Sequence, residues 1–203
     1  LDGQRVALSD QGSSRVESGD LATRLSELLG RYTDASYVVR FGSTGAEAVE
    51  MALAHAVFER KQRVERLIRD LQQTVGARYP VEARKAVHRI EQALADSPPV
   101  VLALEGSFHG HSLAARSVLS DAKKREPFAE MSGLKAEFLS LDDDPTRTVD
   151  RAVSKHEIAV QVPSLVDGQL VPRRVLLDGV VAAIAEPVLG EGGVREVPRA
   201  LLK

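Results

Sequence analysis

Hydrophobic residues follow two patterns along the chain, one with helical spacing and one of short unbroken runs. Leucines from Asp20 to Leu29 fall on one face of a helix, and Gly30 is its predicted stop. The unbroken runs predict buried strands at Tyr37–Phe41, Val100–Leu104 and Val180–Ala185. A further strand is predicted at Ala136–Leu141 and a helix at Pro145–Lys155. Because helices alternate with apolar strands, the pattern predicts an α/β fold with a mostly parallel sheet covered by helices on both faces.

A helix that begins at about Ala46 runs into a predicted helical hairpin spanning about Val57 to Ser97. Apolar residues recur at three-, four- and seven-residue spacings in its two arms: Val57, Val64, Leu67, Leu71 and Val75, then Val81, Val87, Ile90 and Leu94. The turn between them is Gly76–Pro80. Both stripes are narrow, so we expect the hairpin to project from the domain and pack on a partner subunit or a neighbouring domain. The basic residues on its other faces indicate a solvated surface.

A second hairpin, made of strands, is predicted near the end of the chain. Asp167-Gly168 separates the β-rich runs Ile158–Val162 and Gln169–Leu177. An Asp-Gly pair in this position is a strong signal for a two-residue hairpin turn.

The bulk composition excludes several classes of protein. A formal net charge of −2 and an aromatic content of 4% disfavour nucleic-acid binding. The sequence has no apolar run long enough for a membrane span and no signal peptide, and it lacks cysteine, so a cytoplasmic protein is predicted. Leu1 stands where a start methionine would, which suggests a piece of a larger, multidomain polypeptide.

The first candidate motif is Phe41–Glu50, where a predicted strand gives way to a helix. The first turn of a helix exposes unpaired backbone N–H groups and partial positive charge, which suit a phosphate. Gly45 allows close approach, and Ser43 or Thr44 can add a hydroxyl. The alternative is an ordinary helix start capped by Ser43 or Thr44.

Two more motifs follow predicted strands. Glu105–Ser112 offers the ring of Phe108 for stacking and the imidazole of His109 as a proton donor or acceptor. In the alternative reading, Phe108 lies in the core and His109 on the surface. We predict no metal here, because His109 and His111 have no carboxylate or cysteine at ligand spacing.

The third motif, Ala185–Val194, places Glu186 and Glu191 in a glycine-rich turn after a buried strand. Half-buried acids usually have a partner. The alternative is a tight loop in which Glu191 is simply solvated.

Taken in order, Thr44–Ala48, Ser107–Gly110 and Glu186–Gly193 resemble the class III (ω-type) aminotransferases, which are pyridoxal-phosphate (PLP) enzymes of fold type I. The resemblance covers about Asp20 to Val57 and Pro99 to Lys203. It implies that residues 1–203 are part of the large domain, with a mostly parallel seven-stranded sheet, and that the hairpin at about 57–97 is an insertion. It also implies a homodimer with active sites at the subunit interface.

The resemblance also implies roles for individual residues. Thr44, Gly45 and Ala46 would bind the PLP phosphate, mostly through backbone N–H groups. Phe108 would stack on the pyridine ring with His109 beside it. The remaining two positions are acidic: Glu186 would lie near the ring, and Glu191 would face the substrate side, where family members often pair the acid with an arginine.

The sequence departs from the family most at its end. The family's aspartate for the pyridine nitrogen and its Schiff-base lysine both come later than Lys203, so the catalytic residues are not in this chain. We expect the complete protein to move an amino group from an amine or amino acid to a carbonyl acceptor, and this chain alone to be inactive. Two alternatives stay open: an aminomutase, racemase or decarboxylating transaminase of the same fold, and a non-catalytic scaffold that docks through the helical hairpin.

Overall fold

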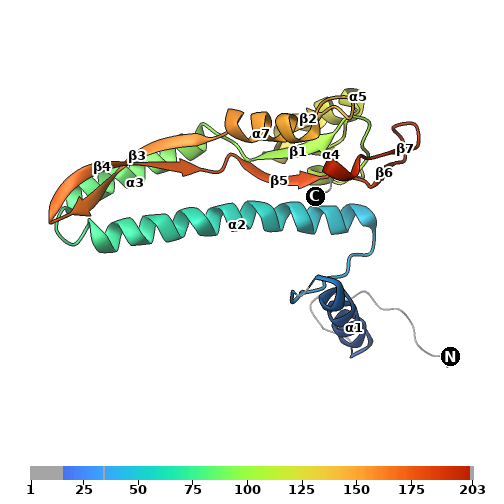
Figure 1. The fold of residues 1–203 in the computed structure, drawn as a ribbon, viewed down its shortest axis with the longest axis horizontal. Helices are drawn as coiled ribbons and strands as arrows, with labels where there is room; N and C mark the ends of the chain where they lie inside the picture. Colours follow the sequence, from blue (N-terminus) through green and yellow to red (C-terminus); the bar gives the residue numbers. More distant parts are fainter. Residues whose placement is uncertain (1–15, 34, 202–203) are drawn as a thin grey trace. The chain divides into compact units, whose positions relative to one another are not determined.

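The computed structural model describes residues 16–33 and 35–201, which form two compact units, Leu1–Thr44 and Gly45–Lys203 (Figure 1). In chain order the elements are α1 Val16–Thr33, α2 Gly45–Thr74, α3 Pro80–Ala95, β1 Val100–Leu104, α4 Leu113–Ser117, α5 Ala122–Arg125, the 3-10 helix η1 Glu126–Phe128, α6 Ala129–Ser132, β2 Lys135–Leu139, α7 Pro145–Lys155, β3 Ile158–Val166, β4 Gln169–Leu177, β5 Val180–Ile184, β6 Val188–Leu189, β7 Arg195–Glu196 and the 3-10 helix η2 Arg199–Leu201.

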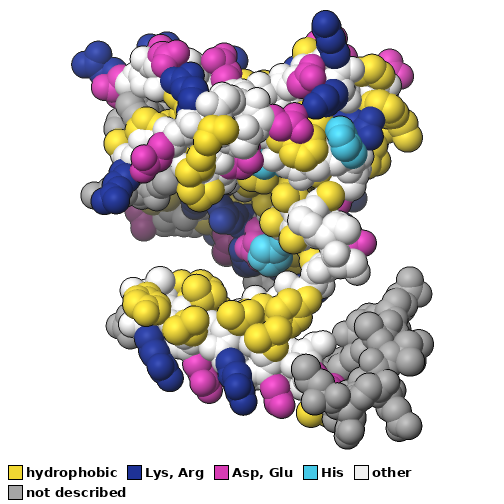
Figure 2. All heavy atoms as spheres, turned by 90° about the vertical axis from the view of Figure 1, so that its right-hand side faces the viewer, with side chains coloured by type: hydrophobic (Ala, Val, Ile, Leu, Met, Phe, Trp, Pro, Cys, Tyr) yellow, Lys and Arg dark blue, Asp and Glu magenta, His cyan; other side chains and the backbone are white. Residues whose placement is uncertain are grey.

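The first unit holds the amphipathic helix α1, which confirms the predicted helix and extends it at both ends. Gly30 does not stop it, since the helix continues to Thr33. None of its residues is buried, and Figure 2 shows hydrophobic side chains along one side of α1 and charged ones along the other.

The predicted strand at Tyr37–Phe41 is wrong, because this segment has no regular secondary structure. Val38 is 89% exposed and Phe41 47% exposed. A strand requires a neighbour whose backbone groups complete the ladder. The described residues of this unit provide no such neighbour, so apolar character alone does not produce a strand here.

A three-stranded parallel sheet in the order β2-β1-β5 forms the centre of the second unit. All five residues of the middle strand, β1, are buried, as its unbroken apolar run predicts. Alternate residues face opposite sides: Val101 and Ala103 pack in a cluster with Leu53 of α2, while Leu102 packs in a cluster with residues of α7. Helices therefore cover both faces of a parallel sheet, which confirms the α/β prediction.

The predicted positions of these strands and of α7 agree with the structure to within one or two residues. The start and end of β1 and α7 are as predicted, β2 begins one residue early and ends two early, and β5 ends one residue early. The parallel sheet formed by the described residues has three strands, whereas the resemblance implies a sheet of seven.

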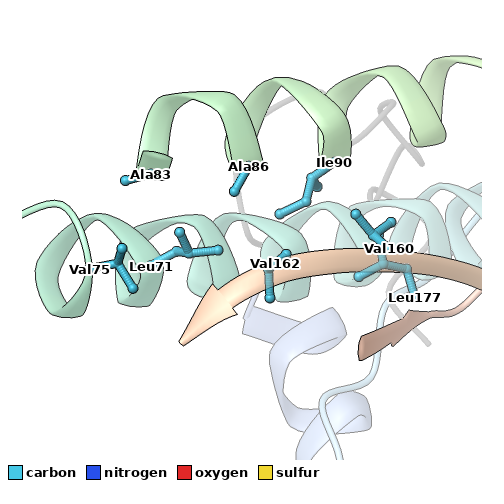
Figure 3. Close-up of a cluster of buried hydrophobic side chains, with 8 residues drawn as sticks. All are labelled: Leu71, Val75, Ala83, Ala86, Ile90, Val160, Val162 and Leu177. Carbon is cyan, nitrogen blue, oxygen red and sulfur yellow. The ribbon is translucent and has the colours of Figure 1, made fainter. Parts of the chain in front are cut away.

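The far half of α2, α3 and the β3–β4 hairpin together make a lobe with its own core (Figure 3). Its buried residues come from all four elements: Leu71, Val75, Ala83, Ala86, Ile90, Val160, Val162 and Leu177. α3 runs back along α2 (Figure 1), as the predicted helical hairpin requires. The β3–β4 hairpin of the same chain thus covers part of the predicted apolar stripes. The stripe residues in this core or packed against it are Val64, Leu67, Leu71, Val75, Ile90 and Leu94, whereas Val81 is 51% exposed.

The predicted β3–β4 hairpin is present, although β3 extends to Val166 and not only to Val162. Its turn explains why it forms. Asp167 and Gly168 have φ values of 51° and 76°, the left-handed pair that a two-residue hairpin turn needs. The phenolic hydroxyl of Tyr79, before α3, donates to the Gly168 carbonyl at 3.3 Å. This contact joins the turn to the helical part of the lobe.

Candidate functional site

The loop after β1 is held by hydrogen bonds to a segment further along the chain. The backbone N–H of Gly106 donates to the hydroxyl of Ser120 at 2.7 Å, and the N–H of Ser120 donates to the carbonyl of Ser107 at 3.2 Å. Gly106 has a φ of +80°, which suits a glycine where the chain leaves the strand. The position of Phe108 and His109 is therefore set by α5 and its lead-in as well as by β1.

Phe108 and Glu186, both predicted site residues, lie side by side. The Phe108 backbone N–H donates to Glu186 Oε2 at 3.0 Å. Glu186 follows β5, the direct neighbour of β1, and parallel strands bring their carboxyl ends to one edge of the sheet. The half-buried ring of Phe108 meets His111 edge to face, with 5.2 Å between ring centroids.

His109 is only 8% exposed, so it is neither a surface residue nor a simple cap. Within the described residues, its Nε2 atom and the hydroxyl of Ser107 are buried without a hydrogen-bond partner. Buried polar atoms in native proteins nearly always have partners. Two such atoms in one loop can form hydrogen bonds with a water molecule or with a polar group of a ligand.

Burial lowers the pKa of His109 below its usual value of 6.5, and the nearby charge of Glu186 only partly opposes this effect. Between the unfolded pKa and the lower folded one, the unfolded chain binds more protons, so stability falls as the pH drops. We expect the free energy of unfolding to decrease from about pH 7.5 to about pH 5.5, and to decrease less in His109→Gln.

Urea unfolding of both forms at several pH values measures this difference. This pH window lies above the pH range in which Glu137 titrates, because the pKa of Glu137 is lowered from 4.5. Equal pH dependence in the two forms would show that His109 is not held neutral by the fold.

The same loop is seated on the first turn of α2, which carries Gly45 and Ala46 of the first motif. Gly110 has a φ of +116°, and a Cβ atom there would lie 2.6 Å from the Cβ of Ala46. The hydroxyl of Ser112 donates to the Ala46 carbonyl at 3.4 Å. Only glycine allows this approach, so Gly110 brings the second motif against the start of α2.

A second contact with α2 holds the short helix α4. The carboxylate of Glu50 accepts the backbone N–H of Ala114 at 2.7 Å, so it caps the start of α4. At Gly45 itself, a Cβ would meet nothing within 4 Å, which means that the space beside this helix start is open. Thr44, the third predicted cradle residue, is the last residue of the first unit.

The third motif packs against the second through glycine. A Cβ on Gly192 would lie 2.8 Å from the Gly106 carbonyl, and Leu189 beneath the turn is 1% exposed. Figure 1 shows β6 and β7, which flank this turn, at the same end of the unit as the start of α2. The second and third motifs thus meet the part of the first motif that begins α2, residues 45–50, at one end of the second unit.

Glu191 is exposed, and its partner was not predicted from the sequence. Its Oε2 atom lies 3.0 Å from the Nζ atom of Lys124 on α5, and that Nζ is 5.5 Å from the centroid of the Phe108 ring. Lys124 and Ser120 lie in a stretch without a clear periodic pattern. No signal in the sequence links either residue to motifs about 15 or 65 positions away.

The described residues offer a helix start, an aromatic ring, a buried imidazole and two carboxylates at one end of the sheet. Among them, no group of three or more histidine, cysteine, aspartate or glutamate side chains could hold a metal ion. No described helix is long and apolar enough to cross a membrane.

Comparison with known proteins finds a matching family and a shared fold. The model of the family "Aminotransferase class-III" matches residues 7–203. A solved amine transaminase from an uncultivated Pseudomonas species, in its PLP-bound (internal aldimine) form, shares the fold with a TM-score of 0.53 and 19% identity. The match covers 95% of this chain and 35% of that one, so the chain spans about a third of its relative's length. No curated protein matches the chain.

Proposed function

The chain belongs to the class-III aminotransferase family, and on this premise we propose that it supplies the phosphate, ring-stacking and acidic parts of a PLP site. The observation that carries the proposal is the meeting of the three motifs at one end of the sheet, through Gly110 on Ala46 and Phe108 on Glu186. The complete enzyme would transfer an amino group from an amine or amino acid to a carbonyl acceptor.

The residues present fit the cofactor. The open space beside Gly45 lets a phosphate reach the first N–H groups of a 30-residue helix, where the helix dipole favours negative charge. Thr44 and Ala46 would complete this cradle. Phe108 would stack on the pyridine ring, and the unpartnered Nε2 of His109 would meet a polar group at its edge.

Bound PLP supplies an electron sink for the bond that breaks at the α-carbon of the amine. The chain's own residues would orient the cofactor ring and exclude water from it. Glu186 holds the backbone of Phe108 in place by accepting its N–H. Burial lowers the pKa of His109 and so favours its neutral form. The neutral imidazole can form a hydrogen bond without adding a positive charge to the site.

The partners of the complete protein follow from the same proposal. An amine donor and a carbonyl acceptor would enter on the side of Glu191. A homodimer, a cytoplasmic location and membership of a larger polypeptide stay predictions.

We expect Gly45→Val to weaken PLP binding by about tenfold, because an isopropyl group would fill the open space beside the helix start. Loss of phosphate contacts at a partly buried helix end costs up to about 2 kcal/mol. The dissociation constant of PLP and the rate of transamination, both measured in the complete enzyme, test the cradle and the proposed function together.

Ala48→Val is the matched control, since Ala48 is exposed one turn further along the same helix. Unchanged PLP affinity in Gly45→Val, or an equal loss in Ala48→Val, would place the phosphate elsewhere.

A further inference from the structure

The lobe made by the far half of α2, α3 and the β3–β4 hairpin differs in charge from the rest of the chain. Residues 57–97 and 158–177, which contain this lobe, carry eleven lysines and arginines and seven acidic side chains. The rest of the chain carries the other 16 of its 27 basic residues and the other 22 of its 29 acidic ones. A local excess of positive charge attracts acidic partners. Figure 1 shows the lobe at the end of the second unit opposite to β6 and β7, so it is separate from the candidate site.

A groove of about 320 Å³ lies between α3 and the hairpin of this lobe. Most of its surface is apolar and comes from the hairpin: Val162, Pro163, Leu170, Val171 and Pro172. On the side of α3 it is lined by the charged residues Glu82 and Arg89. The groove therefore combines an apolar surface with a charged rim.

The charge at this groove is positive. Arg89 and Arg174 are exposed, and neither has an ion-pair or hydrogen-bond partner in the part of the chain that the structure describes. Arg174 lies directly opposite Gln161, another lining residue, and the Cβ atoms of such pairs are about 5 Å apart. The carboxylate of Glu82 already accepts a hydrogen bond from Lys85 Nζ at 3.0 Å. Two guanidinium groups thus remain available to a ligand.

Two prolines decide how a ligand can bind beside them. Pro163 and Pro172 lie opposite each other in β3 and β4. Neither has a backbone N–H, so the hairpin offers no donor at these positions to an added strand. Their rings instead form a rigid apolar surface. A polypeptide ligand would therefore bind here through its side chains and not by extending the sheet.

The chemistry of the lobe favours a protein over a nucleic acid as its partner. Stacking of bases requires aromatic side chains, and residues 57–97 and 158–177 contain only Phe58 and Tyr79. Neither of them lines the groove. An apolar surface beside two arginines suits an apolar side chain flanked by carboxylates, since a guanidinium group can bind a carboxylate through two parallel hydrogen bonds.

We propose that this groove docks an acidic segment of a partner protein. An apolar side chain of the segment packs on Leu170 and the two prolines, and its flanking carboxylates bind Arg89 and Arg174. The proposal does not rest on the proposed function, because no residue of the lobe belongs to the candidate PLP site.

Titration of the 203-residue chain with the peptide acetyl-Glu-Glu-Leu-Glu-Glu-amide, followed by NMR, tests the proposal. The backbone N–H signals of residues 82–92, 161–165 and 169–176 report binding. The matched probe with Gln in place of Glu lacks the charges, and the one with Gly in place of Leu lacks the apolar side chain. We expect saturable shifts with the first peptide and at least about fivefold weaker binding of the other two.

Substitutions in the chain test the two arginines. Arg89→Gln and Arg174→Gln should each weaken binding of the acidic peptide by about threefold, and the double substitution by about tenfold. Arg66→Gln is the matched control, since Arg66 is exposed on α2, has no partner among the described residues and does not line the groove. This control should bind as the unsubstituted chain does. Circular dichroism checks that all of these variants keep the fold.

The proposal is overturned if the unsubstituted chain shows no saturable shifts with the acidic peptide, or if the Gln peptide gives the same ones. A loss in Arg66→Gln equal to that in the double substitution would also overturn it, because binding would then be a general attraction between charges. Tighter binding of a short DNA duplex than of the acidic peptide would make the partner a nucleic acid. Self-association of the chain that is lost in the double substitution would make the occupant a second copy, and either result rejects the proposal.

Discussion

The 203-residue chain, mixed with PLP and reduced with borohydride, should keep its unmodified mass. The resemblance to class III aminotransferases implies that the Schiff-base lysine and the pyridinium aspartate come later than Lys203, so we expect the covalent anchor of the cofactor to be missing from these 203 residues. We also expect no turnover of any amine donor and keto acid by the chain alone.

The noncovalent contacts that remain are too weak to replace the anchor. Phosphate binding at the start of α2 contributes about 0.3–2 kcal/mol, and stacking on Phe108 about 0.5–1.5 kcal/mol. Micromolar affinity requires roughly 8 kcal/mol. Most of the cofactor should therefore stay free, which absorbance after gel filtration measures.

Lys124 is the position to watch in this experiment, because its Nζ lies 5.5 Å from the Phe108 ring. A stoichiometric adduct on Lys124, lost in Lys124→Arg, would show that the catalytic lysine has been misplaced. Scattered, substoichiometric labelling of several exposed lysines would not show that the catalytic lysine has been misplaced.

Ile90→Ala should destabilise the lobe by about 2–5 kcal/mol. Ile90 is fully buried at the middle of α3, in the cluster with Leu71 of α2 and Val160 of β3 (Figure 3). Its truncation leaves a cavity between three elements that come from distant parts of the chain. Hydrogen exchange of the backbone N–H groups of α3, β3 and β4 measures the loss directly.

The matched control is Val81→Ala on the same helix, since Val81 is 51% exposed and should change stability by less than about 0.5 kcal/mol. The core of the sheet around Val101 is a separate cluster, so its slow exchange should change little in Ile90→Ala. An equal increase in the hydrogen exchange of β1 and α3 would show that the lobe and the sheet unfold as one unit.

Local patterns in the sequence were enough to predict several elements with their bounds. β1 is five buried residues in a row, and α7 starts at a proline and an Asp144 side chain that accepts the Arg147 N–H at 2.9 Å. The turn at Asp167-Gly168 depends only on two residues that adopt positive φ. Each of these preferences acts within a few residues, so it can be read without knowing the rest of the fold.

The same local reasoning was wrong at Tyr37–Phe41, where apolar and β-branched residues predicted a strand. A strand depends on a partner, and sequence patterns within the segment carry no information about whether one is present. The stop predicted at Gly30 also failed, because a glycine lowers helix stability without ending the helix.

The residues of the candidate site could be proposed from the order of three motifs, but their arrangement could not. Sequence by itself predicted the helix that begins near Gly45 and the buried strands that Phe108 and Glu186 follow. Only the tertiary structure decided that Gly110 seats its loop on Ala46 and that Lys124 is paired with Glu191. The physical reason is range: backbone preferences act between near neighbours in the sequence, whereas packing and ion pairs join residues that become neighbours only after the chain has folded.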